Sequence, residues 1–374
     1  MRYLFTCGGT AGHINPALAV ADRLKELDPE ATFLFVGASD RMETDLVPRA
    51  GYEIRTVEVS SFRRSLSPSA LAFNVSSLKK AVSSTREAKR IIKEFAPDIA
   101  VGTGGYVCYP VLKAAASMSV PTMVHESNAV PGLTTKMLQD EVDCILVGFE
   151  ESRHNYADPS RVFVTGTPVR GSFTACTKAE AKQQLGLPLD QPLVVSVWGS
   201  LGAQHMNGIM TELIRLAAPD AGFRLIHAAG KSRYEGVAEA LQDVDLAAAG
   251  MDVRPYIYDM PLVMAAADLV LCRAGASTLA ELTLLGKPAI LVPCPNVTYN
   301  HQEKNARVLE HIGGAKVLLE GEFTAESLLQ DVRALLSDSD TLASMAENMR
   351  SAGVADATER ITRMVLEMAR MKQK

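Results

Sequence analysis

The fold class is decided by the stretch from Arg273 to Gln302, which has the sequence RAGASTLAELTLLGKPAILVPCPNVTYNHQ. The run DLVLC at 268–272, directly before it, is typical of a short buried strand. Gly275 permits a tight turn, and Ser277 or Thr278 can cap the start of a helix. A strand, a turn and a helix are therefore predicted in this order.

The same stretch predicts where the helix ends and a second strand begins. Three leucines recur at helical spacing: Leu279, Leu282 and Leu285. Gly286 and Pro288 end the helix, and the apolar residues 289–292 suit a buried parallel strand. Strand, helix and strand in this order indicate an α/β protein with parallel strands.

The start of this helix is a candidate ligand site. Its first turn offers free backbone N–H groups and the positive end of the helix dipole, which suit a phosphate. Glu281 lies one turn in from Ser277, and its carboxylate could accept both hydroxyls of a ribose. Alternatively, Glu281 only complements the helix dipole, as acids near a helix start often do.

Composition narrows the class of protein. The chain has 374 residues, of which 47% are hydrophobic and 22% charged, which suits a soluble protein of about two domains. A net charge of −5 gives no general attraction to nucleic acid. The six cysteines form no Cys-x-x-Cys pair, so we expect neither a zinc ribbon nor a disulfide framework, but a reducing cytoplasm. We expect no secretory leader and no membrane span.

The beginning of the chain predicts one βαβ unit. A short strand at 3–6 is followed by the glycine-rich turn Cys7-Gly-Gly-Thr-Ala-Gly-His13. Asn15 is expected as the helix N-cap with Pro16 at the first helical position, and the helix runs to about Leu27. A second strand follows at 32–36. The glycine turn lies at the carboxyl end of the first strand, where parallel α/β sheets bind ligands.

This alternation continues to residue 165. Further strands are expected at 98–101, 122–125, 144–147 and 162–165, and helices at 109–117 and from 132 to about 139. Loops with small or polar residues follow two of these strands, at 102–106 and 126–132. A doubly wound parallel sheet is therefore predicted for this part of the chain.

The pattern stops at Gly166-Thr-Pro-Val-Arg170 and then starts again. A strand at 193–197, a glycine turn at 199–202, a helix at 204–217 and a strand at 223–228 repeat the plan of the first residues. We expect domains at 1–165 and 172–345, a hinge at 166–171, and C-terminal helices at 346–374, the last from about 356 to 371. Two such domains would share a cleft at the carboxyl ends of their strands.

The glycine turns do not match the common nucleotide motifs. Gly8, Gly9 and Gly12 do not fit Gly-x-Gly-x-x-Gly, and no acid ends the second strand. No Gly-Lys-Ser/Thr phosphate loop occurs either. A nicotinamide oxidoreductase is therefore disfavoured.

Several polar residues are candidates for the chemistry. His13 should face the cleft, where it could take a proton from an attacking hydroxyl or only hold its loop by a hydrogen bond. His125, Glu126 and His301 could be assembled into a metal site, but no pair has ligand spacing on one element. The pairs Asp243/Asp245 and Asp338/Asp340 lie among polar helix-end residues, so we expect no metal there and assign leaving-group charge to helix ends and Arg170.

The segment 62–93 is basic, although the net charge of the whole chain is negative. It holds eight Lys or Arg and one acid, Glu87, with apolar residues interleaved. This mixture suits a surface that contacts anionic lipid. The alternative is an ordinary amphipathic helix with a solvated basic face.

Six motifs occur together in one order: GGTAGH at 8–13, GTGGY at 102–106, HESN at 125–128, GTPVR at 166–170, GSLGA at 199–203 and the stretch 273–302. In this the chain closely resembles the lipid I N-acetylglucosaminyltransferase (MurG) family of bacterial peptidoglycan synthesis. The resemblance covers nearly the whole chain. It implies a GT-B fold of two Rossmann-like domains, with the last helix crossing back to the first.

The resemblance also implies an activity. GlcNAc would be transferred with inversion from UDP-GlcNAc to the 4-hydroxyl of MurNAc in undecaprenyl-diphosphate-MurNAc-pentapeptide, lipid I, to give lipid II. No permanent cofactor or metal is implied. The protein would act as a peripheral protein on the cytoplasmic face of the membrane, with the segment 62–93 on anionic lipid.

The resemblance assigns roles residue by residue. His13 would be the base, Glu281 would hold the ribose, and the Ile257 backbone would recognise uracil. Donor contacts would fall on Thr10, Ala11, Gly12, Asn128, Arg170, Ser200, Ile257, Ala276, Ser277, Thr278, Leu279, Ala280, Glu281 and Gln302. The acceptor side would include Gly104, Gly105, Tyr106, His125 and Glu126.

Two residues depart from the family pattern. Ala11 and Trp198 stand where the family often has glycine, and because neither change removes a polar contact, we expect only tuning. Two other functions remain as alternatives: a UDP-GlcNAc 2-epimerase, which the basic segment disfavours, and a nucleotide-sugar-binding protein without chemistry, which His13 and Glu281 disfavour.

Overall fold

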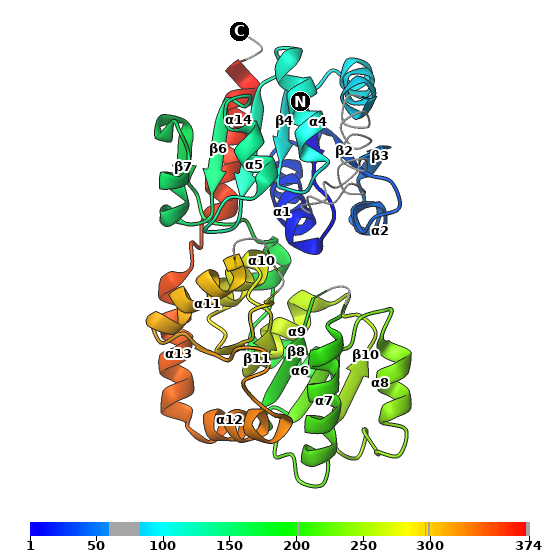
Figure 1. Ribbon diagram of the computed structural model, residues 1–374, viewed down its shortest axis with the longest axis vertical. Helices are drawn as coiled ribbons and strands as arrows, with labels where there is room; N and C mark the ends of the chain where they lie inside the picture. The colour runs from blue at the N-terminus through cyan, green and yellow to red at the C-terminus, as the bar shows by residue number, and fades with distance from the viewer. Residues whose placement is uncertain (60–82, 200–201, 296, 298–299, 372–374) are drawn as a thin grey trace, which may run out of the picture. The chain divides into compact units, whose positions relative to one another are not determined.

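The chain forms two compact units in a computed structural model, which describes residues 1–59, 83–199, 202–295, 297 and 300–371. The first unit comprises Met1–Arg170 with Val354–Lys374, and the second comprises Gly171–Gly353. Figure 1 shows a parallel sheet with flanking helices in each unit. The expected domain limits were 165/166 and 345/346. The chain therefore leaves the first unit five residues later, and re-enters it eight residues later, than those limits.

The first unit contains a seven-stranded parallel sheet in the order β3-β2-β1-β4-β5-β6-β7. Its strands are β1 (Arg2–Thr6), β2 (Thr32–Ala38), β3 (Glu53–Val57), β4 (Ile99–Gly102), β5 (Thr122–Glu126), β6 (Cys144–Val147) and β7 (Val162–Val164). Its helices are α1 (Ala11–Leu27), α2 (Glu43–Arg49), α4 (Cys108–Ser117), α5 (Leu133–Leu138) and α14 (Ala357–Met371), and residues 83–95 are also helical. The strand order reverses between β1 and β4, which is where such sheets bind ligands.

The second unit contains a six-stranded parallel sheet in the order β10-β9-β8-β11-β12-β13. Its strands are β8 (Leu193–Val197), β9 (Arg224–Ala228), β10 (Met251–Arg254), β11 (Leu269–Cys272), β12 (Ala289–Leu291) and β13 (Ala315–Val317). Its helices are α6 (Lys178–Gln184), α7 (Gln204–Ala217), α8 (Tyr234–Ala240), α9 (Met260–Ala266), α10 (Ala276–Leu285), α11 (His301–His311), α12 (Ala325–Ser337) and α13 (Ser339–Ala352). The order reverses between β8 and β11, and α10 follows β11.

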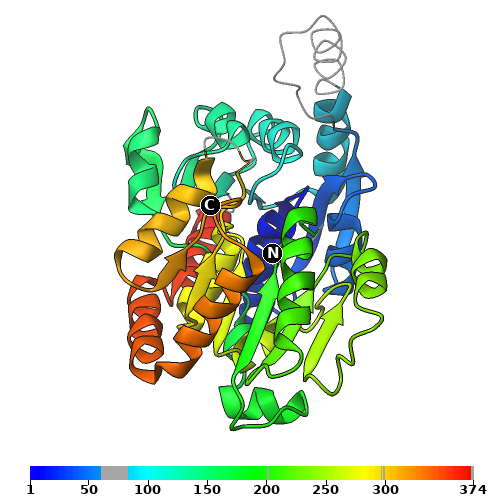
Figure 2. The ribbon, with the colours of Figure 1, turned by 60° about the horizontal axis from the view of Figure 1, so that its bottom comes forward.

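The cores follow from the alternation of side chains along the strands. In β1, Tyr3 and Phe5 point into one cluster with α1 and α14, and Leu4 points into the cluster on the other face. The α14 residues Ile361 and Val365 are buried in the first of these clusters. The last helix therefore completes the first unit. In the second unit, α12 packs beside α7 (Figure 2).

Most elements lie where the sequence predicts them, since β8 and α7 begin and end at the predicted residues. Two helix starts were wrong. Helix α1 begins at Ala11 after Thr10, so Asn15 is not its N-cap and Pro16 lies inside it. Helix α10 begins at Ala276 after an extended Gly275, not after Ser277 or Thr278. In both cases the strand leads into the helix through a glycine turn that needs no side-chain cap.

Within the described ranges, no helix has both the length and the apolar character that crossing a bilayer requires.

Candidate functional site

Two of the predicted glycine loops interlock at the carboxyl edge of the first sheet. The loop after β1 and the loop after β4 are joined by a bond from the Gly8 N–H to the Gly104 carbonyl, at 3.2 Å. Gly105 has a φ of +92°, and a Cβ there would overlap the Gly8 carbonyl oxygen. Glycine is required at this position by the close approach of the two backbones.

His13 lies in the first turn of α1, above this junction. Its Nδ1 is 2.9 Å from the Gly8 carbonyl oxygen. Because a carbonyl only accepts hydrogen bonds, Nδ1 carries the proton, and Nε2 of the neutral ring keeps its lone pair. The ring is half-buried, and its Nε2–Cδ2 edge faces the Gly104 Cα. His13 thus holds its loop with one nitrogen and keeps the other as a proton acceptor.

The other residues proposed for this edge differ in exposure. Thr10 and Tyr106 are exposed, and Ala11 and Gly12 are half-buried at the start of α1. Gly104 is buried, with a φ of +117° that favours glycine.

His125 is buried at the end of β5. Its Nε2 donates to the Gly166 carbonyl at 2.9 Å, and its Nδ1 accepts from the Ser127 hydroxyl at 3.3 Å. Burial lowers the pKa of His125, so the ring stays neutral. Both nitrogens serve the loops of the first unit.

Glu126 organises the loop that follows β5. Its Oε1 accepts from the backbone and side-chain amides of Asn128, at 3.0 and 2.9 Å. Its Oε2 accepts from the Gly132 N–H at 2.8 Å and the Thr135 hydroxyl at 2.9 Å. Four donors surround this buried carboxylate, which fixes Asn128 at the sheet edge.

Arg170 is held by the first unit. Its Nε forms an ion pair with Asp22 of α1 at 2.8 Å. The Tyr52 hydroxyl donates to the other oxygen of the same carboxylate, also at 2.8 Å. The guanidinium therefore lies against α1.

In the second unit, the start of α10 has no side-chain cap. Ser277, Thr278 and Ala280 are half-buried, whereas Ala276 and Leu279 are buried. Glu281 is the sixth residue of α10, beyond its first turn, and is 7% exposed. Complementing the dipole from the first turn is therefore not its role. Burial, followed by the nearby charge of Glu281, raises the pKa of Cys272, which places this carboxylate near the end of β11.

Gln302 and Ile257 lie at the same edge of the second sheet. The Gln302 side-chain carbonyl accepts from the Cys294 N–H at 2.9 Å, so this side chain holds the loop after β12. Ile257 is buried in the loop after β10. Ser200 lies outside the residues that the structure describes.

Arg273, the first residue of the stretch 273–302, holds a loop of the second unit, a role that its sequence pattern did not predict. Its Nη1 donates to the carbonyls of Val292 and Pro293 at 3.1 and 3.2 Å and forms an ion pair with Glu320 at 2.5 Å. Its guanidinium also lies 6.0 Å from the centre of the Trp198 ring. A cation directly after a buried strand is the signal that could have identified it, because such a cation must find partners.

Glu43 is a second residue that holds a loop and that no sequence motif indicated. It lies at the start of α2 and is fully buried beneath the first glycine turn.

Three of the four acids in the two pairs, Asp243, Asp245 and Asp338, contact protein groups. Asp243 forms an ion pair with Arg215 at 2.6 Å, and Asp245 accepts from the Ala248 N–H at 3.0 Å. Asp338 caps α13 through the Thr341 N–H at 3.0 Å. Across the part of the chain that the structure describes, no group of three or more His, Cys, Asp or Glu could hold a metal ion.

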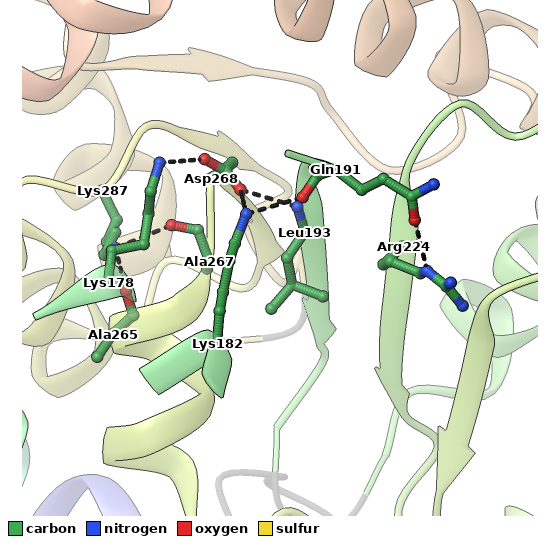
Figure 3. A network of polar contacts seen from close by, with 9 residues as sticks. All are labelled: Lys178, Lys182, Gln191, Leu193, Arg224, Ala265, Ala267, Asp268 and Lys287. Carbon is green, nitrogen blue, oxygen red and sulfur yellow. Dashed lines mark hydrogen bonds and ion pairs between the residues drawn. The ribbon is translucent and has the colours of Figure 1, made fainter. Parts of the chain in front are cut away.

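A second polar cluster lies at the opposite edge of the second sheet (Figure 3). Asp268 accepts from Lys178 at 2.6 Å and from the Leu193 N–H at 2.8 Å, and it pairs with Lys182 at 3.0 Å. Burial opposes ionisation, but these partners hold the pKa of Asp268 below its ordinary value. Lys287 donates to the Ala265 and Ala267 carbonyls at the end of α9, at 2.7 and 2.8 Å. This cluster joins β8, β11, α6 and α9 at the edge away from the glycine loops.

Comparison with known proteins shows the class of enzyme. Residues 3–147 match the glycosyltransferase family 28 N-terminal domain, and residues 193–361 match the C-terminal domain of the same family. The chain is thus a glycosyltransferase, with the two Rossmann-like domains of the GT-B class.

Full-length relatives narrow the family further. The chain is 43% identical to the UDP-N-acetylglucosamine–N-acetylmuramyl-(pentapeptide) pyrophosphoryl-undecaprenol N-acetylglucosamine transferase of Acetivibrio thermocellus. The match covers 100% of this chain and 99% of that one. It is 40% identical to a transferase of the same name from Bacillus cereus, over 96% of this chain and 97% of that one. The chain belongs to this family of transferases.

Solved structures agree with this assignment. MurG of Acinetobacter baumannii superposes with a TM-score of 0.70 at 26% identity, over 98% of this chain and 99% of that one. UDP-GlcNAc 2-epimerase from Neisseria meningitidis, at 15% identity and a TM-score of 0.66 over 98% of this chain and all of that one, shares the fold alone. Of the two enzyme functions considered from the sequence, the comparisons favour the transferase.

Proposed function

We propose that this protein transfers GlcNAc from UDP-GlcNAc to the 4-hydroxyl of MurNAc in undecaprenyl-diphosphate-linked MurNAc-pentapeptide, lipid I, to give lipid II. The observation that carries the proposal is full-length identity of 38 to 43% to transferases whose names state these two substrates. The candidate base in the first unit and the amide-rich helix start in the second supply the groups that this reaction needs.

His13 acts as the base. Its Nε2 takes the proton of the acceptor hydroxyl while the hydroxyl oxygen forms a bond to C1 of GlcNAc. The bond from C1 to the diphosphate oxygen breaks at the same time, and its electron pair leaves with UDP. Attack opposite the leaving group inverts the configuration at C1 and gives a β-linkage.

The second unit holds the donor. The first amides of α10, near Ser277 and Thr278, face the diphosphate, where the helix dipole favours negative charge. Glu281 accepts the ribose hydroxyls, and the backbone at Ile257 recognises uracil. Helix amides then stabilise the leaving group in place of a divalent ion.

The described part of the basic segment, residues 83–93, lies in the helix at 83–95. Ala88, Ile91 and Ile92 are buried against the sheet. Four exposed basic side chains recur at helical spacing on the other side: Arg86, Lys89, Arg90 and Lys93. Such a stripe suits the anionic inner face of the cell membrane, where the enzyme binds as a peripheral protein. The rest of the segment, 62–82, lies outside the described residues.

The reaction is tested with radiolabelled UDP-GlcNAc and a short-chain lipid I analogue, with and without EDTA. We expect a β-linked disaccharide product in both conditions and a loss of about a hundredfold or more in His13→Ala. His154→Ala, at an exposed histidine of the same unit, is the matched control. Absence of product would overturn the function, and formation of UDP-ManNAc without acceptor would indicate the epimerase.

The membrane contact is tested by sedimentation with phosphatidylglycerol vesicles. The double variant Lys89→Glu/Lys93→Glu should bind less than the wild type, whereas Lys304→Glu, at an exposed lysine of the second unit, should not. Equal binding by all three proteins would refute the proposed surface.

A further inference from the structure

Glu43 is a fully buried carboxylate that contacts the loop of the candidate base. Its Oε2 accepts the Gly9 N–H at 2.9 Å, and its Oε1 accepts the Ala38 N–H, also at 2.9 Å. Ala38 is the last residue of β2, so the side chain ties the end of that strand to the glycine turn after β1. A carboxylate is costly to bury, and these two bonds stabilise it there.

The Gly9 N–H and the Gly8 carbonyl belong to the same peptide group. This peptide is trans, so its N–H and its carbonyl point to opposite sides. Glu43 accepts on one side, and His13 Nδ1 donates on the other at 2.9 Å. The carboxylate, the peptide and the imidazole therefore form one continuous hydrogen-bonded chain.

A peptide between two glycines needs an external clamp. Gly9 has a φ of +85°, and with no Cβ on either residue the peptide plane rotates at little cost. Glu43 also explains why residue 8 is glycine, because a Cβ there would overlap Glu43 Oε1. The same applies to Gly37, where a Cβ would lie 2.6 Å from Glu43 Cγ.

We propose that Glu43 is a positioning residue that acts on His13 through the Gly8–Gly9 peptide, an inference that rests on the proposed role of His13 as the base. By holding the N–H, Glu43 keeps the Gly8 carbonyl aimed at Nδ1. That carbonyl keeps the proton on Nδ1 and the lone pair on Nε2, which is the form a base requires. Hydrogen bonds in such a chain also strengthen one another.

Glu43→Gln is the test variant, and Glu53→Gln is its matched control. The glutamine oxygen can accept a hydrogen bond from only one of the Gly9 and Ala38 N–H groups, and its NH₂ group opposes the other, so the bridge from β2 to the Gly8–Gly9 peptide is lost. Glu53 loses the same charge from an exposed position on β3 of the same unit. We expect kcat/KM for the lipid I analogue to fall about tenfold to a hundredfold in Glu43→Gln and to stay unchanged in Glu53→Gln, with an unchanged KM for UDP-GlcNAc.

A double-mutant cycle with His13→Ala separates positioning from a general structural effect. If Glu43 acts through His13, the double variant is no slower than His13→Ala. The proposal would be overturned if the loss of kcat/KM in the double variant equalled the product of the two single losses. A Glu43→Gln enzyme with wild-type kcat/KM would also overturn it. If Glu43→Gln does not fold, Glu43→Asp takes its place, since one shorter carboxylate cannot reach both amides.

The ring nitrogens of His13 give a readout that does not depend on turnover. In ¹⁵N-histidine spectra we expect one tautomer, with the proton on Nδ1, in the wild type and a mixture in Glu43→Gln. A single unchanged tautomer in the variant would overturn the proposal. If the wild type makes no disaccharide, the proposed function fails, and these spectra still test the Glu43 contact.

Discussion

At the carboxyl edges of their sheets, the two units hold their loops with side chains of opposite charge. In the first unit, Glu43 and Glu126 accept hydrogen bonds from backbone N–H groups of the ligand loops. At the same edge of the second unit, the cationic side chain of Arg273 donates to the backbone carbonyls of Val292 and Pro293.

This difference bears on where an anion binds. The carboxylates of the first unit occupy the amides of Gly9, Asn128 and Gly132, and they place negative charge beneath the loops. In the second unit, the charge of Arg273 is paired with Glu320, and Gly275, the N-cap residue of α10, supplies no side-chain cap to that helix. The positive end of the α10 dipole therefore favours the UDP diphosphate on the second unit, and we expect proton transfer at His13 on the first.

The largest effect on the free energy of unfolding is expected when Arg273 is replaced. Arg273→Met leaves the largely buried Glu320 without its cation and two strand-end carbonyls without a donor. The second unit should lose about 3 to 5 kcal/mol of unfolding free energy. Urea unfolding followed by the fluorescence of Trp198, the only tryptophan, measures it. Arg307→Met, on the exposed face of α11, is the control, and an equal loss in both variants would contradict the comparison.

Lys287 should make the second unit more stable as pH rises. Burial, and then the nearby charge of Lys178, lower the pKa of Lys287 from 10.5 to about 8. Between these values the unfolded chain binds more protons than the folded one, so unfolding free energy increases with pH. Below pH 8 the desolvation penalty is fully present.

The test compares the wild type with Lys287→Met from pH 7 to 10 by urea unfolding. As pH rises from 7 to 10, the unfolding free energy of the wild type should increase relative to that of the variant by up to about 3 kcal/mol, at about 1.4 kcal/mol per pKa unit. For Lys304→Met, at an exposed position, the difference in unfolding free energy from the wild type should not change with pH. If the Lys287→Met difference is also constant with pH, the buried ammonium does not titrate in this way.

A smaller loss is expected for Glu126→Gln in the first unit. The amide keeps one acceptor oxygen, and its NH₂ group faces donors that Glu126 Oε2 now satisfies, from Gly132 and Thr135. Unfolding free energy should fall by about 2 kcal/mol. Amide hydrogen exchange should quicken in residues 126–135 and remain unchanged in the exposed control Glu151→Gln. Unchanged exchange at 126–135 would show that another group holds this loop.

The architecture was predictable because its signals are local. Buried parallel strands are continuous apolar runs, and a glycine or small-residue loop marks most of their carboxyl ends, so β8, α7 and the strand–helix–strand unit around α10 follow from the sequence. The starts of α1 and α10 did not follow. Capping rules favour Asn15 and Ser277, but a chain that leaves a strand through a glycine turn enters the helix at once.

The site was predictable as a set of loops but not as a set of contacts. A position at a strand end gives the edge of the sheet, not the direction of the side chain, so the burial of His125 did not follow from the sequence, and its place on the acceptor side stays a prediction. Glu43 was missed because its partner is a backbone amide 34 residues away, and such a bond leaves no pattern of side chains in the sequence. His13 was proposed because its turn is short and rich in glycine, and its role as the base stays a prediction.

The smallest effect is expected for Asp243→Asn, which tests whether the second unit uses its own cations or a divalent ion. Asp243 already pairs with Arg215 at an exposed site, and screened surface pairs contribute little. Transfer activity should therefore stay within about twofold of wild type and be equal in Mg²⁺ and EDTA. A tenfold loss that Mg²⁺ restores would make Asp243 a metal ligand. The charge for the leaving group would then come from a bound ion, and Arg273 and the start of α10 would no longer distinguish the second unit from the first.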